Sequence, residues 1–264
     1  MGDRHSGPAP FRSRRPLPPV REIFPSMTRR RWIADEVSGD HAALLGSHAD
    51  HLVHVLRARI GQEFDIATDE NVRLGRVVSV TDGRVDFDLG EVISVRSSTL
   101  SLTLLLSIFK FDRMEWAIEK CVELGVARIM PVIAQRTDAH LAAAAPKRLE
   151  RWHRIARQAS EQSRRTASPQ ILSPVNLGQA VTQASGTRIV LAESESDRTL
   201  KGALEELTPA TTVNLAIGPE GGWTDPELKL FLGAGWTSAS LGSTILRAET
   251  AAIAAAAVVF AELQ

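Results

Sequence analysis

Residues 100–126 read LSLTLLLSIFKFDRMEWAIEKCVELGV, and this stretch indicates how the larger part of the chain folds. Residues 100–108 form a nearly continuous apolar run, which is typical of a strand buried on both faces of a parallel sheet. From 112 to 124 the apolar side chains recur at helical spacing, and Gly125 follows where helices commonly end. A buried strand followed by an amphipathic helix is the repeating unit of an α/β fold.

The same alternation continues to the end of the chain. Thr224 and Glu227 have the spacing of a capping box, and Pro226 lies in the first turn of the helix that they begin. We therefore expect a parallel sheet with helices on its faces over residues 99–264. The further strands are expected at 128–133, 188–192, 213–217 and 238–241, and the further helices at 146–165, after Thr224 and at 249–263.

Residues 28–98 have a different pattern, which predicts a small β-barrel. Alternating and β-branched residues predict strands at 62–68, 72–81 and 84–95, separated by turn residues. One helix is expected among them, capped by Ser47 and continuing through 51–59.

Residues 1–27 are rich in Pro, Arg and Ser and show no periodicity, so we expect a disordered leader. They lack the apolar core of a secretory signal, which argues against export. A basic arm that contacts RNA is the alternative interpretation.

Composition limits the classes of protein to be considered. Apolar residues make up 44% and charged residues 23% of the chain, as in ordinary globular proteins, and no apolar run is long enough to cross a bilayer. The single cysteine, Cys121, excludes an internal disulfide and fits a reducing cytoplasm, and its place on an apolar helix face predicts a core thiol.

The net charge is zero, but the charge is unevenly placed. Residues 99–170 contain 12 basic and 7 acidic side chains, and Arg accounts for most of the basic residues in the whole chain. Arg suits phosphate contacts and base stacking, although the codon usage of a GC-rich genome explains the Arg bias equally well. The placement therefore favours a nucleic-acid partner more than the amount of charge does.

Three unusual loops follow predicted strands, at 191–194, 217–223 and 241–250. Ligands of open parallel sheets bind at the carboxyl ends of the strands. Gly218, Gly221, Gly222 and Gly242 would let the backbone approach a flat ligand closely. GPEGG alone is typical of an ordinary turn, but three such loops together predict a ligand site. Neither a G-x-G-x-x-G fingerprint nor a Walker A loop is present, which argues against a nicotinamide or P-loop enzyme.

Two other patterns have competing interpretations. His48, His51 and His54 lie three residues apart, but they sweep too wide an arc of a helix to converge on a metal, so we expect no metal site. The helix at 146–165 has a charged face that ends in EQSRR (161–165). That cluster suits phosphate and base contacts, whereas a solvated helix face is the simpler explanation.

Four ordered motifs carry a family resemblance. FDRMEWAIEKCVELGV (111–126), EQSRR (161–165), IGPEGGW (217–223) and LGSTILRAETA (241–251) resemble the RsmE family of 16S ribosomal RNA uridine-N3 methyltransferases, which belongs to the SPOUT class. HLVHVLRARIGQ (51–62) resembles the PUA-like RNA-binding β-barrel of that family. The resemblance extends from about residue 29 to the end. DENVR (69–73) departs from the Gly-containing turn that the family often has, which bears on the barrel alone.

The resemblance implies a SPOUT-type parallel sheet with a C-terminal trefoil knot, a homodimer, and S-adenosylmethionine bound by the three loops. Naked 16S rRNA or the assembled small subunit would be the substrate. The implied cofactor-binding residues are Leu191, Ala192, Glu193, Ile217, Gly218, Pro219, Gly221, Gly222, Leu241, Gly242, Ile245, Leu246, Arg247 and Ala251.

Methyl transfer to uridine N3 requires loss of the N3 proton and places negative charge on the base oxygens. We expect Arg247 to stabilise that charge, with a structural pair to Glu249 as the alternative. Glu220 or Glu249 would accept the proton, and the alternative for these carboxylates is to hold the loops by capping backbone N–H groups. The residues expected to contact RNA are Arg29, Arg30, Arg31, His54, Arg57, Arg113, Arg164 and Arg165. The alternative functions are a SPOUT enzyme acting on ribose 2′-OH or on tRNA, and a catalytically silent RNA-binding protein.

Overall fold

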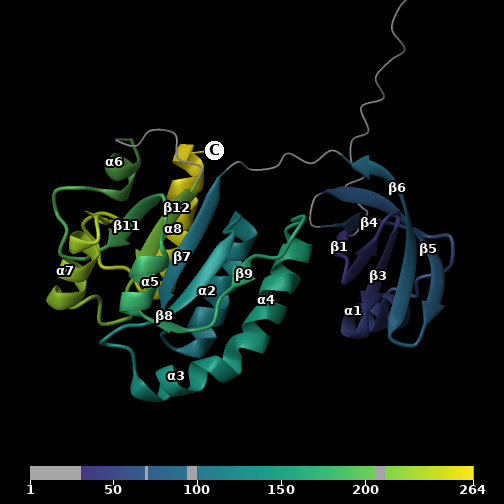
Figure 1. Ribbon diagram of the computed structural model, residues 1–264, viewed down its shortest axis with the longest axis horizontal. Helices are drawn as coiled ribbons and strands as arrows, with labels where there is room; N and C mark the ends of the chain where they lie inside the picture. Colours follow the sequence, from purple (N-terminus) through teal and green to yellow (C-terminus); the bar gives the residue numbers. More distant parts are fainter. Residues whose placement is uncertain (1–30, 69–70, 94–99, 206–211, 264) are drawn as a thin grey trace, which may run out of the picture.

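The computed structural model describes residues 31–68, 71–93, 100–205 and 212–263, and two β-sheets organise them (Figure 1). The smaller, N-terminal sheet has the strand order β1-β4-β5-β6-β3-β2, antiparallel except for the β1–β4 pair. Its strands are β1 (Arg31–Ile33), β2 (Glu36–Ser38), β3 (His41–Leu45), β4 (Glu63–Ala67), β5 (Val72–Thr81) and β6 (Arg84–Ile93).

The N-terminal sheet differs from the expected barrel in being open. Within the described residues, β1 and β2 lie at its two edges and do not pair with each other. The three strands before residue 46 were not predicted, because they are only three to five residues long and one of them, β2, is wholly exposed.

The predicted helix of this sheet is present in altered form, as α1 (Gly46–Asp50) followed by a π-helical turn, His51–Val55. The predicted cap is wrong, because Leu45 occupies the N-cap position and no side chain caps the helix.

The larger sheet is parallel throughout, as predicted. Its order is β10-β8-β7-β12-β11-β13, and β9 pairs with β8. The strands are β7 (Ser101–Ser107), β8 (Arg128–Ile133), β9 (Gln170–Ile171), β10 (Val175–Asn176), β11 (Thr187–Leu191), β12 (Thr212–Ile217) and β13 (Thr237–Ala239). The helices are α2 (Phe111–Leu124), α3 (Ala139–Ala144), α4 (Leu149–Gln162), α5 (Leu177–Gln183), α6 (Leu200–Glu205), α7 (Asp225–Gly233) and α8 (Ala248–Leu263), with a 3-10 turn at Ala145–Arg148.

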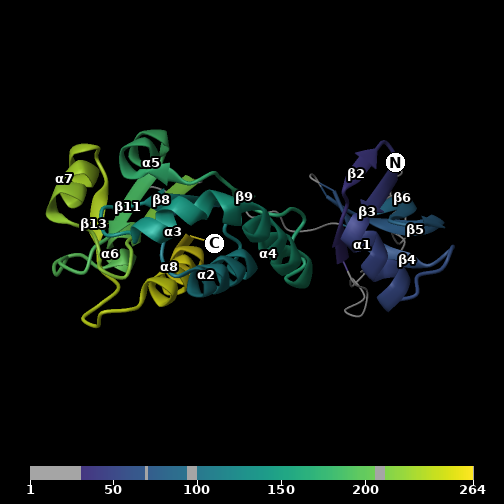
Figure 2. The ribbon, with the colours of Figure 1, turned by 90° about the horizontal axis from the view of Figure 1, so that it is seen from below.

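Helices cover both faces of the larger sheet (Figure 2). Strand β7 is buried on both sides because successive side chains point to opposite faces: Leu104 and Leu106 pack under α2, α4 and α8, while Leu105 packs under α5 and α7. On the second face Phe231 lies edge-on between Trp223 and Trp236, at 4.9 Å between ring centroids in each case. No helix in the described ranges is both long and apolar enough to cross a membrane.

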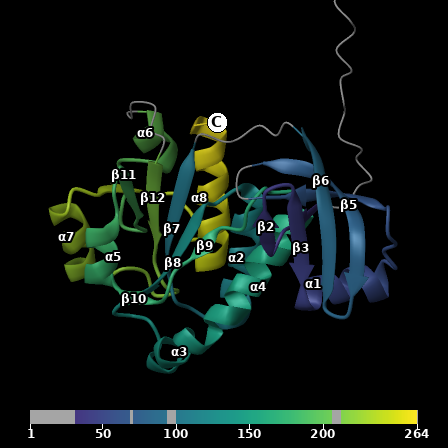
Figure 3. The same cartoon turned by 45° about the vertical axis from the view of Figure 1, so that its right-hand side comes forward.

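Two predicted helix boundaries are tested by the structure. Thr224 and Glu227 form the predicted capping box of α7. The single helix expected over 146–165 is instead a 3-10 turn followed by α4, which ends at Gln162, and Arg164 then adopts the left-handed conformation with φ 59°. Helix α4 lies on the side of the larger sheet that faces the N-terminal sheet (Figure 3).

Candidate functional site

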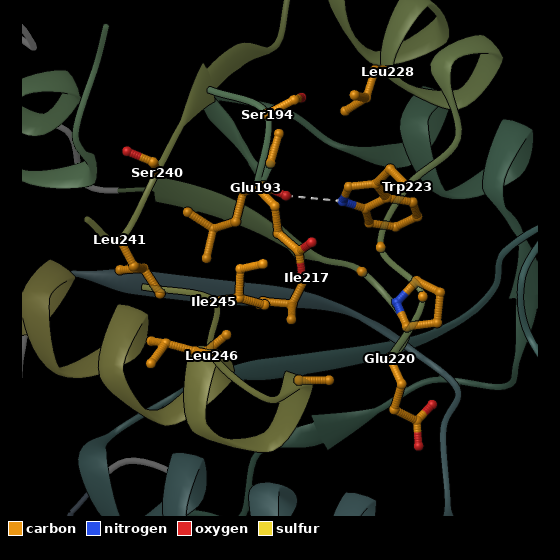
Figure 4. Close-up of a pocket in the computed structure, with 18 of the residues that line it drawn as sticks. Glu193, Ser194, Ile217, Glu220, Trp223, Leu228, Ser240, Leu241, Ile245 and Leu246 are labelled. Atoms are coloured by element: carbon orange, nitrogen blue, oxygen red, sulfur yellow. Dashed lines mark hydrogen bonds between the residues drawn. The ribbon is translucent and has the colours of Figure 1, made fainter. Parts of the chain in front are cut away.

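A cavity of about 490 Å³ opens where the three predicted loops meet at the carboxyl ends of β11, β12 and β13 (Figure 4). This volume is typical of a small-molecule site. Every residue expected to bind the cofactor lines the cavity except Arg247. The lining also includes Arg136, Ser194, Glu220, Trp223, Asp225, Leu228, Ser240, Ser243, Thr244 and Ala248.

The loop after β12 is held in a compact turn and tied to the loop after β11. Gly222 has φ 67° and donates its N–H to the carbonyl oxygen of Pro219 at 2.8 Å. The Trp223 indole N–H donates to the carbonyl oxygen of Leu191 at 3.0 Å. A Cβ at Gly222 would lie 3.7 Å from the Glu193 carboxylate and would be strained by the positive φ. Glycine at this position therefore keeps the turn unstrained and that side of the cavity open.

The third loop begins beside the chain that follows β11, in a parallel bridge between Ser240 and Thr199. Ser240 donates its N–H to the carbonyl oxygen of Arg198 at 2.9 Å, and Leu200 donates to the carbonyl oxygen of Ser240 at 2.8 Å. After this bridge the loop turns at Gly242, with φ 111°, and lines the cavity before α8 begins. Ile245 leaves 79% of its surface exposed here, which gives the cavity an apolar rim.

The cavity is lined by more acidic than basic side chains. Glu193, Glu220 and Asp225 line it, and Arg136 is the one cation among the described lining residues. Arg136 lies in the loop that follows β8 and donates to the carbonyl oxygen of Gly221. Sequence reasoning missed Arg136 because no glycine-rich motif marks its loop. Its place after a buried strand, at the same edge of the sheet, was the available signal.

The three residues expected to act in catalysis have different surroundings. Glu249 is buried at the start of α8, and its Oε1 lies 3.6 Å from Nη1 of Arg113 rather than beside Arg247. Its Oε2 is buried without a hydrogen-bond partner. Arg247 is exposed. The carboxylate of Glu220 points away from Trp223, and its Oε1 accepts the Lys110 N–H at a long 3.5 Å (Figure 4).

The residues expected to contact RNA are dispersed over the molecule. Arg29 and Arg30 lie outside the described residues. Arg31 is buried and donates to the carbonyl oxygen of Arg164. Arg165 donates to the carbonyl oxygens of Val122 and Val126, at 2.9 and 2.7 Å, where it closes the end of α2. The geometry gives Arg165 a structural role, and its contact with RNA stays a prediction.

The π-helical turn His51–Val55 and the residues next to it carry exposed polar side chains. His54 and Arg57 are exposed, and Arg57 has φ 53°. The ligand atoms of Asp50, His54 and Asp82 lie within 4.8 Å of one another, whereas His48 lies beside Asp35. The three clustered side chains are all exposed, and the expectation of a metal-free protein stays a prediction.

The chain is similar in sequence to known RNA methyltransferases. Residues 96–260 match the model of the RNA methyltransferase domain. The ribosomal RNA small subunit methyltransferase E of Mycobacterium bovis is 32% identical over 83% of this chain and 85% of its own length. The enzyme of that name from Synechocystis is 37% identical, but the alignment spans only 54% of its length and 62% of this chain.

Solved structures agree in fold. The ribosomal RNA small subunit methyltransferase E from Neisseria gonorrhoeae, bound to S-adenosyl methionine, matches 88% of this chain and 97% of its own, with TM-score 0.78 and 29% identity. A putative methyltransferase from Legionella pneumophila, in complex with the same cofactor, matches 88% and 96% with TM-score 0.76 and 31% identity. With the family model covering more than half of its length, this chain belongs to the ribosomal RNA small subunit methyltransferase E family.

Proposed function

We propose that this protein transfers a methyl group from S-adenosylmethionine to N3 of a uridine in 16S ribosomal RNA. The observation that carries the proposal is the three-loop cavity at the carboxyl edge of a parallel sheet, in a fold whose solved relatives are bound to this cofactor. The uridine N3 position rests on the family resemblance of the four sequence motifs.

The residues of the cavity fit the cofactor. Leu191, Ile217 and Leu246 offer apolar surface to a flat ring, and the glycine turn offers backbone groups without a Cβ in the way. S-adenosylmethionine supplies an electrophilic methyl group on a positively charged sulfonium. The acidic surplus of the lining favours such a cation, while Arg136 is placed to hold a negatively charged oxygen at the rim.

Three groups of this chain are proposed to serve the chemistry. The two candidates for the proton acceptor of N3–H are Glu220, which is exposed and lines the cavity, and Glu249, whose buried Oε2 has no hydrogen-bond partner. Arg247 is exposed at the end of the third loop, where its guanidinium would stabilise negative charge on the base oxygens. The cavity walls hold the reacting atoms in line, which is the main contribution of a protein to this type of transfer.

We assign RNA binding to residues 28–98 and methyl transfer to residues 99–264, with 1–27 as a leader. The exposed His54 and Arg57 of the N-terminal sheet support this division. The trefoil knot is proposed on the family resemblance of the sequence motifs alone. A homodimer is supported by Trp116 of α2, which leaves 48% of its surface exposed. We further propose that the protein acts in the cytoplasm and needs no metal.

Mass spectrometry of rRNA nucleosides tests the proposal. RNA from a strain that lacks the gene should lack 3-methyluridine in the small subunit, and purified protein with S-adenosylmethionine should restore it. A ribose-methylated product, recognised by an alkali-resistant phosphodiester, would favour the 2′-OH alternative. If calorimetry gave no heat of binding with the cofactor, the protein would instead be a silent RNA-binding protein.

A further inference from the structure

Helix α4 meets an open edge of the N-terminal sheet. Strand β1 pairs with β4 on one side only, and Ala34 donates its N–H to the carbonyl oxygen of Ala67 at 2.9 Å. Because backbone groups alternate in direction along a strand, the N–H and carbonyl of Ile33 point to the other side, where no strand of the described residues is paired with β1.

Two side chains of α4 occupy the place of the missing strand. The Arg157 guanidinium donates to the carbonyl oxygen of Ile33, and the Glu161 carboxylate accepts the N–H of the same residue. Arg157 and Glu161 are one helical turn apart and lie 3.4 Å from each other. One helix face therefore binds both outward-facing groups of Ile33, as a paired strand would.

Further polar contacts surround this pair. Nη1 of Arg157 lies 2.6 Å from Oδ1 of Asp35, and the other oxygen of Asp35 accepts the Leu45 N–H at 2.8 Å. His48 lies 3.4 Å from Asp35 and 3.9 Å from Glu161, so it bridges the two carboxylates. Arg31 and Arg164 add the hydrogen bond described above. We call Asp35, His48, Arg157 and Glu161 the joint.

The joint is shielded from water. The exposed fraction of its side chains is 23% for Arg157, 18% for Asp35 and 13% for Glu161. Burial raises the pKa of Glu161 above its ordinary value. Burial also acts to raise the pKa of Asp35, but hydrogen bonds from His48 and Leu45 and the charge of Arg157 outweigh it and lower that pKa. Charge-assisted hydrogen bonds in such surroundings are strong and demanding in geometry.

We propose that Arg157 and Glu161 are positioning residues that hold the N-terminal sheet in one orientation, so that RNA bound on it delivers its uridine to the cavity. This inference rests on the proposed methyl transfer. An RNA that binds both the N-terminal sheet and the cavity requires a fixed orientation between the two, since a displacement of the reacting atoms of about 1 Å costs on the order of 100-fold in rate. None of the four residues of the joint lines the cavity.

The orientation can be measured without activity. Spin labels at Asp82→Cys and Lys229→Cys would report the distance between the β5–β6 turn and α7, because both sites are exposed and the native Cys121 is buried. The full-length protein, labelled and diluted with an excess of unlabelled protein so that intersubunit pairs do not contribute, should give one narrow distance distribution. Arg157→Gln should broaden the distance distribution. Arg157→Lys should broaden the distribution less, because Lys keeps the positive charge, but not leave it unchanged, because Lys contacts fewer acceptors than Arg. Lys201→Ala, which removes an exposed paired cation on α6, should leave it unchanged.

Kinetics separate positioning from simple stabilisation. With 16S rRNA as substrate, Arg157→Gln should raise KM for RNA about tenfold. The Kd for S-adenosylmethionine, measured by calorimetry, should stay as in wild type. Asp35→Asn serves as a second variant if Arg157→Gln does not fold, with the same expectations. An unchanged distance distribution together with unchanged KM would overturn the positioning role. Failure of the wild-type protein to methylate RNA would instead overturn the proposed function.

Discussion

Glu249 lies 3.6 Å from the guanidinium of Arg113, across the start of α8 from α2, and not beside its sequence neighbour Arg247. Among the described residues, the ion pair of Glu249 is with Arg113, and the pair with Arg247 stays the alternative prediction for that residue. This arrangement gives the buried Glu249 a cation on one side and an unpaired oxygen on the other.

The first prediction concerns proton removal by Glu249. Glu249→Gln keeps the shape of the side chain but cannot accept a proton, so turnover should fall about 100-fold. The Kd for S-adenosylmethionine should be unchanged in calorimetry, because the charge is not part of the cavity lining. Glu262→Gln, near the other end of the same helix, should keep wild-type turnover. Normal turnover of Glu249→Gln would remove it as the proton acceptor and leave Glu220.

Arg136 and Arg247 are expected to have separable roles. Arg136→Ala should weaken cofactor binding about tenfold, because it removes the single cation among the described lining residues. Arg247→Ala should keep cofactor affinity and lower turnover on the order of 100-fold, since its charge is proposed to act on the base. Calorimetry with S-adenosylmethionine and single-turnover rates measure the two effects. If Arg136→Ala bound the cofactor with wild-type affinity, the proposed role of Arg136 in cofactor binding would be wrong.

Gly222 should be required for cofactor binding beyond its effect on stability. An Ala at φ 67° costs about 1–2 kcal/mol of backbone strain, and its Cβ would face Glu193. Gly222→Ala should therefore weaken cofactor affinity as well as lower the midpoint of urea unfolding. Gly83→Ala is the matched control, because Gly83 has φ 68° in the β5–β6 turn with nothing near its Cβ position. Equal cofactor affinities in the two variants would contradict this assignment.

Arg165 should prove structural. Arg165→Ala removes two charge-assisted hydrogen bonds to the end of α2, each with a net contribution of about 1.5–3 kcal/mol. The midpoint of thermal unfolding should fall by several degrees, while RNA affinity at low temperature should stay close to that of wild type. A large loss of RNA affinity in a variant with unchanged unfolding would restore the direct contact predicted from sequence.

Cys121 should be inert to thiol reagents in the native protein. Burial raises the pKa of its thiol to about 12, so almost none of the reactive thiolate is present near pH 8. The reaction with a chromogenic disulfide should be slow and should become fast on unfolding in guanidinium chloride. Rapid labelling of the folded protein would mean that α2 opens away from the core.

The larger sheet could be predicted from sequence because its signals are local. A few consecutive residues are enough to recognise a continuous apolar strand, such as β7 or β8, and the capping box that begins at Thr224. The three loops could be assigned to one site because parallel strands end at the same edge. Short elements such as β2 and α6 have too few residues for a periodic pattern, so they were missed.

Long-range contacts were the other limit. The charged face of α4 suggested RNA or solvent, whereas Arg157 and Glu161 of that face bind the backbone of Ile33, more than 120 residues earlier in the sequence. Arg136 likewise lies at the cavity because of the tertiary fold, and no local sequence motif marks its position. Such assignments depend on which surfaces meet, and the sequence pattern shows only that a face is polar.

The edge of β1 has a consequence for synthesis in the cell. A growing chain emerges with its N-terminus first, so Ile33 leaves the ribosome 124 residues before Arg157. Throughout that interval the outer edge of β1 can pair with any other exposed strand, including one from a neighbouring nascent chain. We expect a fragment truncated before α4 to self-associate. Once α4 is complete, it covers the edge of β1 and prevents this association.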